Sequence, residues 1–241
     1  MNTLFLSDLH LEDRRPEVAG WLWTFLDGPA READAVYILG DLFEYWIGDD
    51  AVPPLAVELA RRTAALVDRG IPFYFQHGNR DFLLSVDFAK RSGMQLLPEA
   101  VVADLYGTPT LLMHGDSLCT DDIEYQAFRR QSRDPAWQTV ILSKSVDERI
   151  AIARGARDAS AQHKGGSNMS IMDVNESAVE RAFTEHGVNR LIHGHTHRPA
   201  VHRHALPGGA TATRYVLADW YERGSYLEVS PDGVRSVEVE P

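Results

Sequence analysis

Five short apolar runs, each ending directly in a polar motif, constrain the fold of this chain more than any other feature. They lie in the segments TLFLSDLH, AVYILGDLFE, PFYFQHGNRD, TLLMHGDS and RLIHGHTH. Short runs of Leu, Ile, Val, Phe and Tyr that end in Gly or Asp are typical of buried strands in an α/β sheet. Because open α/β sheets place their sites beyond the strands' carboxyl ends, we expect the polar motifs to lie at such an edge.

Helical patterns separate these runs. One spans Pro16 to Leu26, and another spans Pro54 to Asp68, where Gly70 and Pro72 stop it. About 75 residues then separate the motif at His114 from the next apolar run, and apolar positions recur there at helical intervals. We therefore predict an α/β core formed by residues 1–121 and 190–241, with a helical cap insertion at 122–189.

The C-terminal part has a different pattern, with short segments in which apolar and polar residues alternate. They are Tyr215–Leu217, Tyr226–Val229 and Val234–Val239. Alternation of this kind predicts half-buried strands, and we expect them to be antiparallel.

The polar motifs supply seven oxygen or nitrogen donors. Asp8 and His10 are two residues apart, as are His195 and His197, so an extended backbone would direct each pair to one side. Gly194, just before the second pair, allows a close approach of the backbone. The full set is Asp8, His10, Asp41, Asn79, His114, His195 and His197.

This donor set predicts a dinuclear metal centre. Carboxylate, carboxamide and imidazole together suit Mn²⁺, Fe²⁺ or Zn²⁺ without any thiolate. Seven donors exceed what one ion with open positions needs, so two ions sharing a bridging carboxylate fit better. Such two-metal sites are typical of phosphoester hydrolases.

The charge distribution limits the partners. The net charge is −11, from 24 basic and 35 acidic side chains, which argues against a nucleic-acid ligand. Residues 125–168, however, hold eight basic and four acidic side chains. That segment is either a solvated helical surface or a contact region for an anionic substrate or membrane.

Cysteine usage and apolar segments indicate the compartment. Cys119 is the only cysteine, which excludes an internal disulfide and fits a reducing compartment. No run approaches the ~20 apolar residues that span a bilayer, and no basic stretch precedes TLFLSDLHL. We expect neither a secretory signal nor a transmembrane anchor, and a cytoplasmic location.

The ordered motifs D-x-H, G-D, G-N, H-G and G-H-x-H resemble those of the calcineurin-like metallophosphoesterase superfamily. Longer strings resemble the UDP-2,3-diacylglucosamine pyrophosphohydrolase family: LFLSDLHL, YILGDLFEYWIGDD, HGNRDFLL, MHGDSLCTDD, IMDVN and LIHGHTHRPAVH. This resemblance covers nearly the whole chain and weakens in the cap and at the C-terminus. It implies a β-sandwich flanked by helices, with a helical cap over the active site.

The resemblance also implies an activity and a location. The family hydrolyses the pyrophosphate of UDP-2,3-diacylglucosamine to UMP and 2,3-diacylglucosamine 1-phosphate (lipid X) in lipid A biosynthesis. A hydroxide activated by two metal ions would attack the phosphorus next to uridine. The enzymes are peripheral proteins on the cytoplasmic face of the inner membrane, and we infer no obligate protein partner.

Roles in the metal centre follow residue by residue from the same resemblance. One Mn²⁺ would be held by Asp8, His10 and His197. The other would be held by Asn79, His114 and His195. Asp41 would bridge the two ions, and the implied catalytic residues are Asp41, Asn79, Arg80 and His114.

Arg80 departs from the wider superfamily, where G-N-H-D/E is common and the histidine protonates the leaving group. Here the string is Gly78-Asn79-Arg80-Asp81. A guanidinium stays protonated near neutrality and cannot act as a general acid. It offers a planar fork to phosphate oxygens, which suits cleavage of an anhydride whose leaving group is already a stable anion. The bland alternative is a surface ion pair with Asp81.

Substrate contacts rest on the resemblance. The positions that match the family are Asn79, Arg80, Asp122, Ser160 and His195. Two further family contacts fall at Lys164 and Ser167, where the family carries an amide and a lysine, so both assignments stay open. Several apolar side chains line either an acyl-chain groove or the ordinary core, and these are Trp46, Phe82, Leu83, Tyr125 and Phe128.

Two other functions compete with this one. A nucleotide pyrophosphatase or phosphodiesterase of the same superfamily would share the donors and Arg80, and only the cap and the long family strings argue against it. A binding scaffold with a disabled site should have lost ligands, whereas all seven are present.

Overall fold

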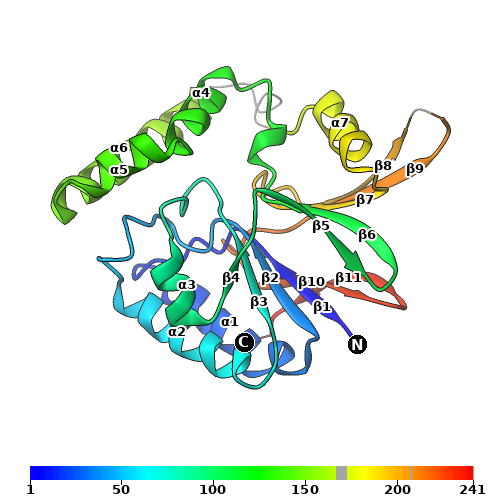
Figure 1. The fold of residues 1–241 in the computed structure, drawn as a ribbon, viewed down its shortest axis with the longest axis horizontal. Coiled ribbons are helices and arrows are strands. Elements are labelled where there is room, and N and C mark those ends of the chain that lie inside the picture. Colours follow the sequence, from blue (N-terminus) through cyan, green and yellow to red (C-terminus); the bar gives the residue numbers. More distant parts are fainter. Residues whose placement is uncertain (167–172, 207, 241) are drawn as a thin grey trace.

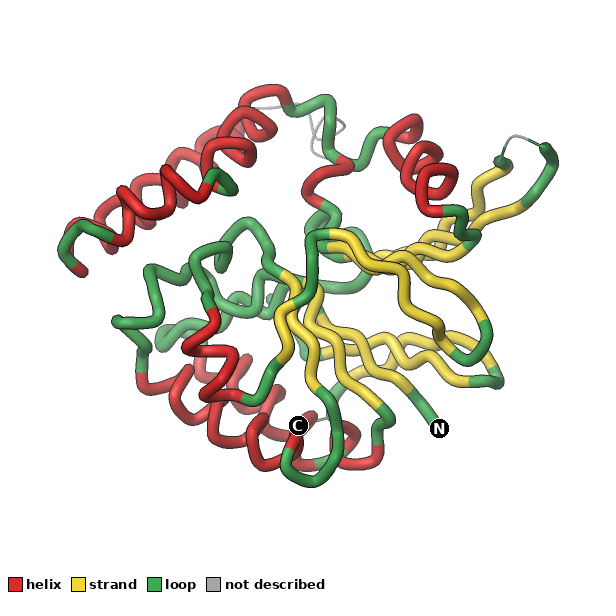
Figure 2. Tube along the Cα trace, in the orientation of Figure 1, coloured by secondary structure: helices red, strands yellow, loops and turns green. Residues whose placement is uncertain are grey.

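The computed structural model describes residues 1–166, 173–206 and 208–240, with the side chains of 159–166 excepted. Two β-sheets face each other, helices cover their outer faces, and three further helices stand apart from the sheets (Figure 1; Figure 2). The predicted α/β class, with two sheets flanked by helices, is confirmed.

The first sheet has the strand order β11-β10-β1-β2-β3-β4. Its first four strands in the chain run parallel, and β10 and β11 are antiparallel to their neighbours. The bounds are β1 Thr3–Leu6, β2 Ala35–Leu39, β3 Phe73–Gln76, β4 Gln95–Leu96, β10 Ser225–Ser230 and β11 Gly233–Glu238.

Helices α1 (Pro16–Asp27), α2 (Pro54–Val67) and α3 (Val86–Ser92) cover the outer face of this sheet, and a 3₁₀ turn at Pro29–Glu32 follows α1 (Figure 1). Side chains alternate between the two faces of a strand. In β1, Leu4 and Leu6 belong to the buried cluster shared with these helices, whereas Phe5 belongs to the cluster between the sheets.

The second sheet has the order β5-β6-β7-β9-β8. The bounds are β5 Ala100–Leu105, β6 Thr108–Met113, β7 Arg190–His193, β8 Ala200–Ala205 and β9 Thr211–Val216. Its inner face meets the first sheet through Leu112 and Ile192, which cluster with Phe5 and Leu39. On its outer face, Val179 and Phe183 of α7 (Glu176–His186) are buried with Leu111 and Leu191.

Helices α4 (Ile123–Ser132), α5 (Pro135–Leu142) and α6 (Val146–Gly166) lie apart from both sheets, and a 3₁₀ turn at Asp116–Leu118 leads to them (Figure 1). We call α4–α6 the cap helices. The division at 122–189 stays a proposal. Because α7 is buried against the second sheet, we propose that the insertion ends with α6 and that α7 belongs to the core.

The expected elements compare closely with the structure. All five apolar runs form strands, and helices α1 and α2 match their predicted ranges to within one residue. The tail strands also form, but β9 is parallel to β7 and antiparallel only to β8. The five motifs follow strands of two sheets, as the β-sandwich implied by the resemblance requires. Among the described residues, no helix has the length and apolarity needed to cross a membrane.

Candidate metal centre

The loops after β1, β2, β3, β6 and β7 meet at one end of the two sheets and bring the predicted donors together. Two groups form, each with three ligand atoms within 4.8 Å of one another. The first group is Asp8, His10 and His197, and the second is Asp41, His114 and His195.

The backbone around these donors is not extended. Five of the six non-glycine residues with positive φ in the described part of the chain are donors, with φ between 50° and 69°: Asp8, His10, Asp41, His195 and His197. The expectation that an extended D-x-H segment aligns its side chains was therefore wrong. A non-glycine residue in the left-handed region costs on the order of 1–3 kcal/mol, and such strain concentrates at functional sites.

The two carboxylate oxygens of Asp8 have different surroundings. Oδ2 accepts hydrogen bonds from the Ser7 hydroxyl at 2.6 Å and from the His195 amide at 2.8 Å. Oδ1 is buried, has no hydrogen-bond partner among the described residues, and lies 3.3 Å from His197 Nε2 and 4.0 Å from His10 Nε2. A buried anionic oxygen beside two imidazole nitrogens fits a bound cation, which would compensate the cost of burial.

Burial of Asp8 alone would raise the pKa of its carboxyl group. The close approach of His197 and the charges of the surrounding histidines outweigh burial and lower that pKa well below its usual range. Gly194 explains how the chain fits here, because a Cβ at this position would collide with the Ser7 and Asp8 side chains. The expected close approach at Gly194 is confirmed.

Asp41 lies between the two groups. Its Oδ1 accepts a hydrogen bond from the Arg80 amide at 2.8 Å. Its Oδ2 lies 4.0 Å from His10 Nε2, in the first group, and 3.8 Å from His114 Nε2, in the second. One oxygen is thus held by the protein, and the other is within reach of both groups.

The second group also includes Asn79. The Nδ1 atom of His114 lies 2.8 Å from the Leu39 carbonyl oxygen, to which it can only donate, so Nε2 is left as the acceptor nitrogen. Asn79 Oδ1 is 3.1 Å from His114 Nε2 and 3.0 Å from His195 Nδ1. The structure therefore places all seven predicted donors in the two groups.

Three further side chains contact the donor histidines and were missed from the sequence. Glu44 Oε2 lies 3.2 Å from His10 Nδ1, and Asp219 Oδ2 lies 3.6 Å from His197 Nδ1. The Tyr221 ring stacks on His10 with centroids 5.3 Å apart. Glu44 stands in the quoted string GDLFE, but Asp219 and Tyr221 follow β9 and carry no recognisable motif.

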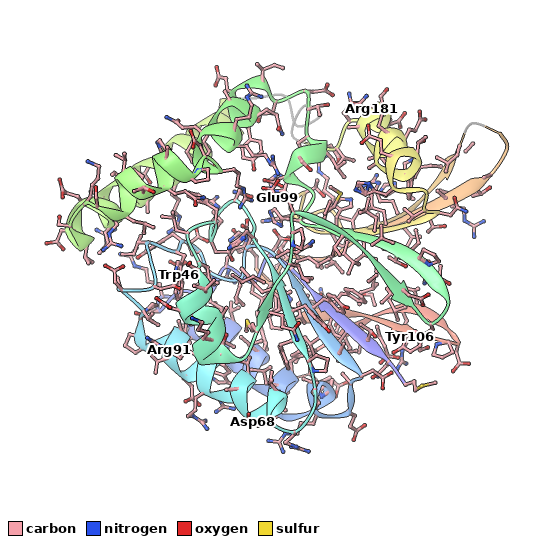
Figure 3. All side chains as sticks on the ribbon, in the orientation of Figure 1. Trp46, Asp68, Arg91, Glu99, Tyr106 and Arg181 are labelled. Carbon is pink, nitrogen blue, oxygen red and sulfur yellow. The ribbon has the colours of Figure 1, made fainter. Side chains whose placement is uncertain are left out.

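A cavity of about 430 Å³ opens from the donors toward the cap helices. At its polar end lie Arg80 and Asp122, and the Nε atom of Arg80 is buried without a partner among the described residues. Asp122 also caps α4 by accepting from the Tyr125 amide at 2.9 Å. The apolar lining includes all five side chains singled out earlier: Trp46 (labelled in Figure 3), Phe82, Leu83, Tyr125 and Phe128.

Much of the basic charge of residues 125–168 is neutralised by core acids. Arg129 and Arg133 both pair with Asp116 and with Glu99, which lies between sheets and cap (Figure 3). Arg149 binds Asp50, with Nη1–Oδ1 and Nη2–Oδ2 distances of 2.7 and 2.5 Å. These arginines therefore attach the cap helices to the core. Neither alternative predicted for this segment, a solvated surface or a contact region for an anionic ligand, included this role.

Three predicted substrate contacts fall where side chains are not described. Ser160 and Lys164 are in α6, whose backbone is described there without side chains, and Ser167 lies outside the described residues. The choice between Lys164 and Ser167 stays open. Asn79, Arg80, Asp122 and His195 all line the cavity.

Fold and site together define a metal-dependent hydrolase with a dinuclear centre. The model of the calcineurin-like phosphoesterases matches residues 1–199, so the chain belongs to that family. A protein of Stenotrophomonas maltophilia named UDP-2,3-diacylglucosamine hydrolase is 52% identical over 97% of this chain and 96% of its own length. The protein of that name from Xanthomonas oryzae pv. oryzae is 51% identical over 97% of each chain.

A solved structure supports the fold alone. An archaeal phosphodiesterase superposes with a TM-score of 0.50 over 99% of both chains, at 11% sequence identity. The identity is too low to transfer a substrate, and the likeness is confined to the arrangement of sheets and helices.

Proposed function

We propose that this protein hydrolyses the pyrophosphate bond of UDP-2,3-diacylglucosamine, giving UMP and 2,3-diacylglucosamine 1-phosphate in lipid A biosynthesis. The similarity to hydrolases named for this substrate extends over 97% of the chain, so it includes the cap. The observation that carries the proposal is one cavity lined both by residues of the two metal-ligand groups (His10, Asp41, Asn79, His195 and His197) and by aromatic and aliphatic side chains. A nucleotide lipid presents the same succession of anionic and apolar parts.

The two groups would hold two Mn²⁺ ions. Asp8, His10 and His197 would bind the first and Asn79, His114 and His195 the second, with Asp41 Oδ2 shared between them. Two such ions would lower the pKa of a bound water and neutralise phosphate charge. Their donor set contains no thiolate, which suits Mn²⁺ as well as Fe²⁺ or Zn²⁺.

Arg80 would bind the phosphates and stabilise the charge that develops on them. Its amide holds Asp41, and its buried Nε has no partner among the described residues, so the guanidinium is available to an anion. A planar guanidinium can donate two parallel hydrogen bonds to phosphate oxygens. It cannot supply a proton to the leaving group, which fits cleavage that expels a phosphate monoester.

The cap would select the lipid part of the substrate. Phe82, Phe128 and Trp137 make ring contacts with centroids 6.1 to 6.5 Å apart along the cavity. The exposed apolar side chains Val140, Leu142 and Val146 lie around the junction between α5 and α6. We propose that they contact the cytoplasmic face of the inner membrane, where the substrate resides, and that the enzyme is a peripheral cytoplasmic protein without an obligate protein partner.

Product analysis tests this function. The protein is supplied with Mn²⁺ and, in parallel, with UDP-2,3-diacylglucosamine or with UDP-glucosamine, which lacks the acyl chains. We expect UMP release from the lipid nucleotide to be at least 100-fold faster, because the apolar wall binds only acylated substrate; burying several methylenes at about 0.8 kcal/mol each is enough for that ratio. Equal rates on both substrates would contradict the proposal. A chelator-treated sample controls for the metal requirement.

A further inference from the structure

Glu44 is a buried carboxylate that touches the metal centre on one side and the cap on the other. Its Oε2 lies 3.2 Å from Nδ1 of His10, and its Oε1 lies 2.9 Å from Nε of Arg157 on α6. The side chains of Glu44 and His10 are 5% and 2% exposed, so their contact is shielded from water, whereas Arg157 is 43% exposed. The seven-donor set does not use Glu44.

The two ring nitrogens of His10 face different groups. Nε2 lies 3.3 Å from His197 Nε2 and 4.0 Å from both Asp8 Oδ1 and Asp41 Oδ2, so it is the nitrogen that faces the ion. Nδ1 faces Glu44. A carboxylate on the far nitrogen of a metal-binding histidine fixes the tautomer with the proton on that nitrogen, sets the ring orientation and raises the basicity of the ligand atom.

The backbone holds Glu44 in place relative to His10. The His10 amide donates to the Asp41 carbonyl at 3.0 Å, and the Glu44 amide donates to the Leu11 carbonyl at 3.1 Å. The segments that carry the two side chains therefore pair like short strands, with Leu11 and Phe43 bridged in parallel. Movement of α6 cannot displace the Glu44 backbone easily, but it can remove Arg157 from the carboxylate.

From these contacts we infer that Glu44 is the positioning residue of the first metal site and that Arg157 holds it there, so that the seating of the cap sets the affinity of this site. The inference rests on the proposed dinuclear centre. When α6 is seated, Arg157 keeps the Glu44 carboxylate directed at His10. When α6 moves away, the carboxylate loses that partner and His10 loses part of its orientation.

The chain offers two matched controls. Arg149, two helical turns before Arg157 on α6, binds Asp50 and the Ile47 carbonyl, which fastens the same helix without touching a donor histidine. Glu12 Oε2 lies 3.6 Å from Arg157 Nη1 but has no contact with His10 in the described structure. Asp50→Ala therefore removes a cap contact, and Glu12→Gln removes the other acid beside Arg157.

The experiment is a Mn²⁺ titration of the metal-free protein, followed by calorimetry and by the signal of free Mn²⁺. We expect two sites in the unmodified protein. Glu44→Gln should weaken one site about tenfold and Glu44→Ala on the order of 10- to 100-fold, with the other site unchanged. Arg157→Gln should weaken the same site by less. Glu12→Gln should leave both affinities within about twofold. Asp50→Ala, which loosens the same helix without removing a contact of Glu44, should weaken the first site by less than Arg157→Gln does.

A double variant decides whether Arg157 acts through Glu44. If it does, adding Arg157→Gln to Glu44→Ala causes no further loss, because the partner is already gone. Additive losses of Mn²⁺ affinity would overturn the proposal that Arg157 of the cap acts through Glu44. Unchanged affinities in both Glu44 variants, or equal weakening of both sites, would overturn the positioning role.

Folding is checked by the thermal midpoint of each metal-free variant. If Glu44→Ala does not fold, the nearly isosteric Glu44→Gln is judged by the same criterion and serves as the background for the double variant.

Failure of the proposed function has a different signature, because the unmodified protein would then bind fewer than two Mn²⁺ ions. If instead Glu44 has no positioning role, the unmodified protein still binds two Mn²⁺ ions, and the Glu44 and Arg157 variants bind them with the same affinities as the unmodified protein.

Discussion

The backbone amide of Arg80 donates to Oδ1 of Asp41 at 2.8 Å, and this bond determines which carboxylate oxygen the metal centre can use. Strands β2 and β3 are parallel neighbours with Leu39 opposite Gln76, so the loops that follow them lie side by side. A Cβ on Gly78 would collide with Asp41 Oδ1, so glycine is required for this approach. Oδ2 is left facing His10 and His114.

Removal of the Asp41 carboxylate should therefore disturb both metal sites. We expect Asp41→Ala to lose both ions, because the shared oxygen serves two centres, whereas His197→Ala should lose mainly the first ion. Metal content per chain, measured after desalting beside the unmodified protein, tests this. Retention of two tightly bound ions by Asp41→Ala would exclude a bridging role.

Asp116 should be a major attachment point of the cap. It is 3% exposed, and its Oδ2 accepts from the Tyr125 hydroxyl and from Arg129 Nε, both at 2.9 Å. We expect Asp116→Asn to lower the free energy of unfolding of the metal-free protein by about 3 kcal/mol, since it removes the buried carboxylate of this ion-pair network and leaves Arg129 with the exposed Glu99 alone. Urea unfolding measures this, with the exposed Asp232→Asn as the control.

The contribution of Asp116 to the free energy of unfolding should depend on pH. Burial would raise the pKa of its carboxyl, but the charges of His114, Arg129 and Arg133 outweigh burial and lower it. A depressed folded-state pKa gives stability that is complete above the unfolded value near 3.8 and is lost as the pH falls through the folded value. The difference in stability between wild type and Asp116→Asn should thus be constant above about pH 5 and shrink below pH 4. A constant difference down to pH 3 would contradict this.

The donors could be predicted from the sequence because their residue types and their order along the chain do not depend on how the segments between them fold. Five apolar runs with polar ends were sufficient to identify strands β1, β2, β3, β6 and β7 and the seven side chains that follow them. Strands β4, β5 and β8 were missed: β4 has two residues, and much of β5 and β8 is exposed, so none shows a buried apolar run.

Features that depend on tertiary contacts could not be predicted in this way. The left-handed φ of Asp8 and His10 exists because surrounding loops hold it, while local geometry alone favours an extended chain. Arg149 and Arg157 looked like surface charge, since their partners Asp50 and Glu44 are about 100 residues earlier. The burial of α7 likewise depends on a sheet whose strands flank the insertion.

Arg80 should contribute to the rate more than to substrate affinity. Its guanidinium would bind phosphate oxygens most strongly when charge develops on them, so Arg80→Met should reduce kcat on the order of 10²- to 10³-fold. Arg80→Lys keeps the charge but loses the fork, and we expect an intermediate rate. Steady-state kinetics on the lipid nucleotide test this, with the exposed Arg154→Gln as a control for general loss of charge. A rise in KM alone would mean that Arg80 only binds the ground state.

The last prediction concerns which phosphorus is attacked. Attack next to uridine expels the sugar 1-phosphate, whereas attack on the other phosphorus expels UMP. Both leaving groups are stable anions that need no proton from Arg80, so leaving-group chemistry does not choose between them. The apolar wall formed by Trp46, Phe82 and Phe128 does favour one orientation, since it draws the acyl chains toward the cap.

Turnover in ¹⁸O-labelled water distinguishes the two orientations, because the new oxygen stays on the phosphorus that is attacked. With the acyl chains along the apolar wall, we expect the uridine-side phosphorus to lie over the metal ligands. Mass spectrometry should then find the label in UMP and none in 2,3-diacylglucosamine 1-phosphate. The products incubated separately in labelled water control for later exchange. Label in the lipid phosphate would place the substrate in the opposite direction, with Arg80 bound to the other phosphate.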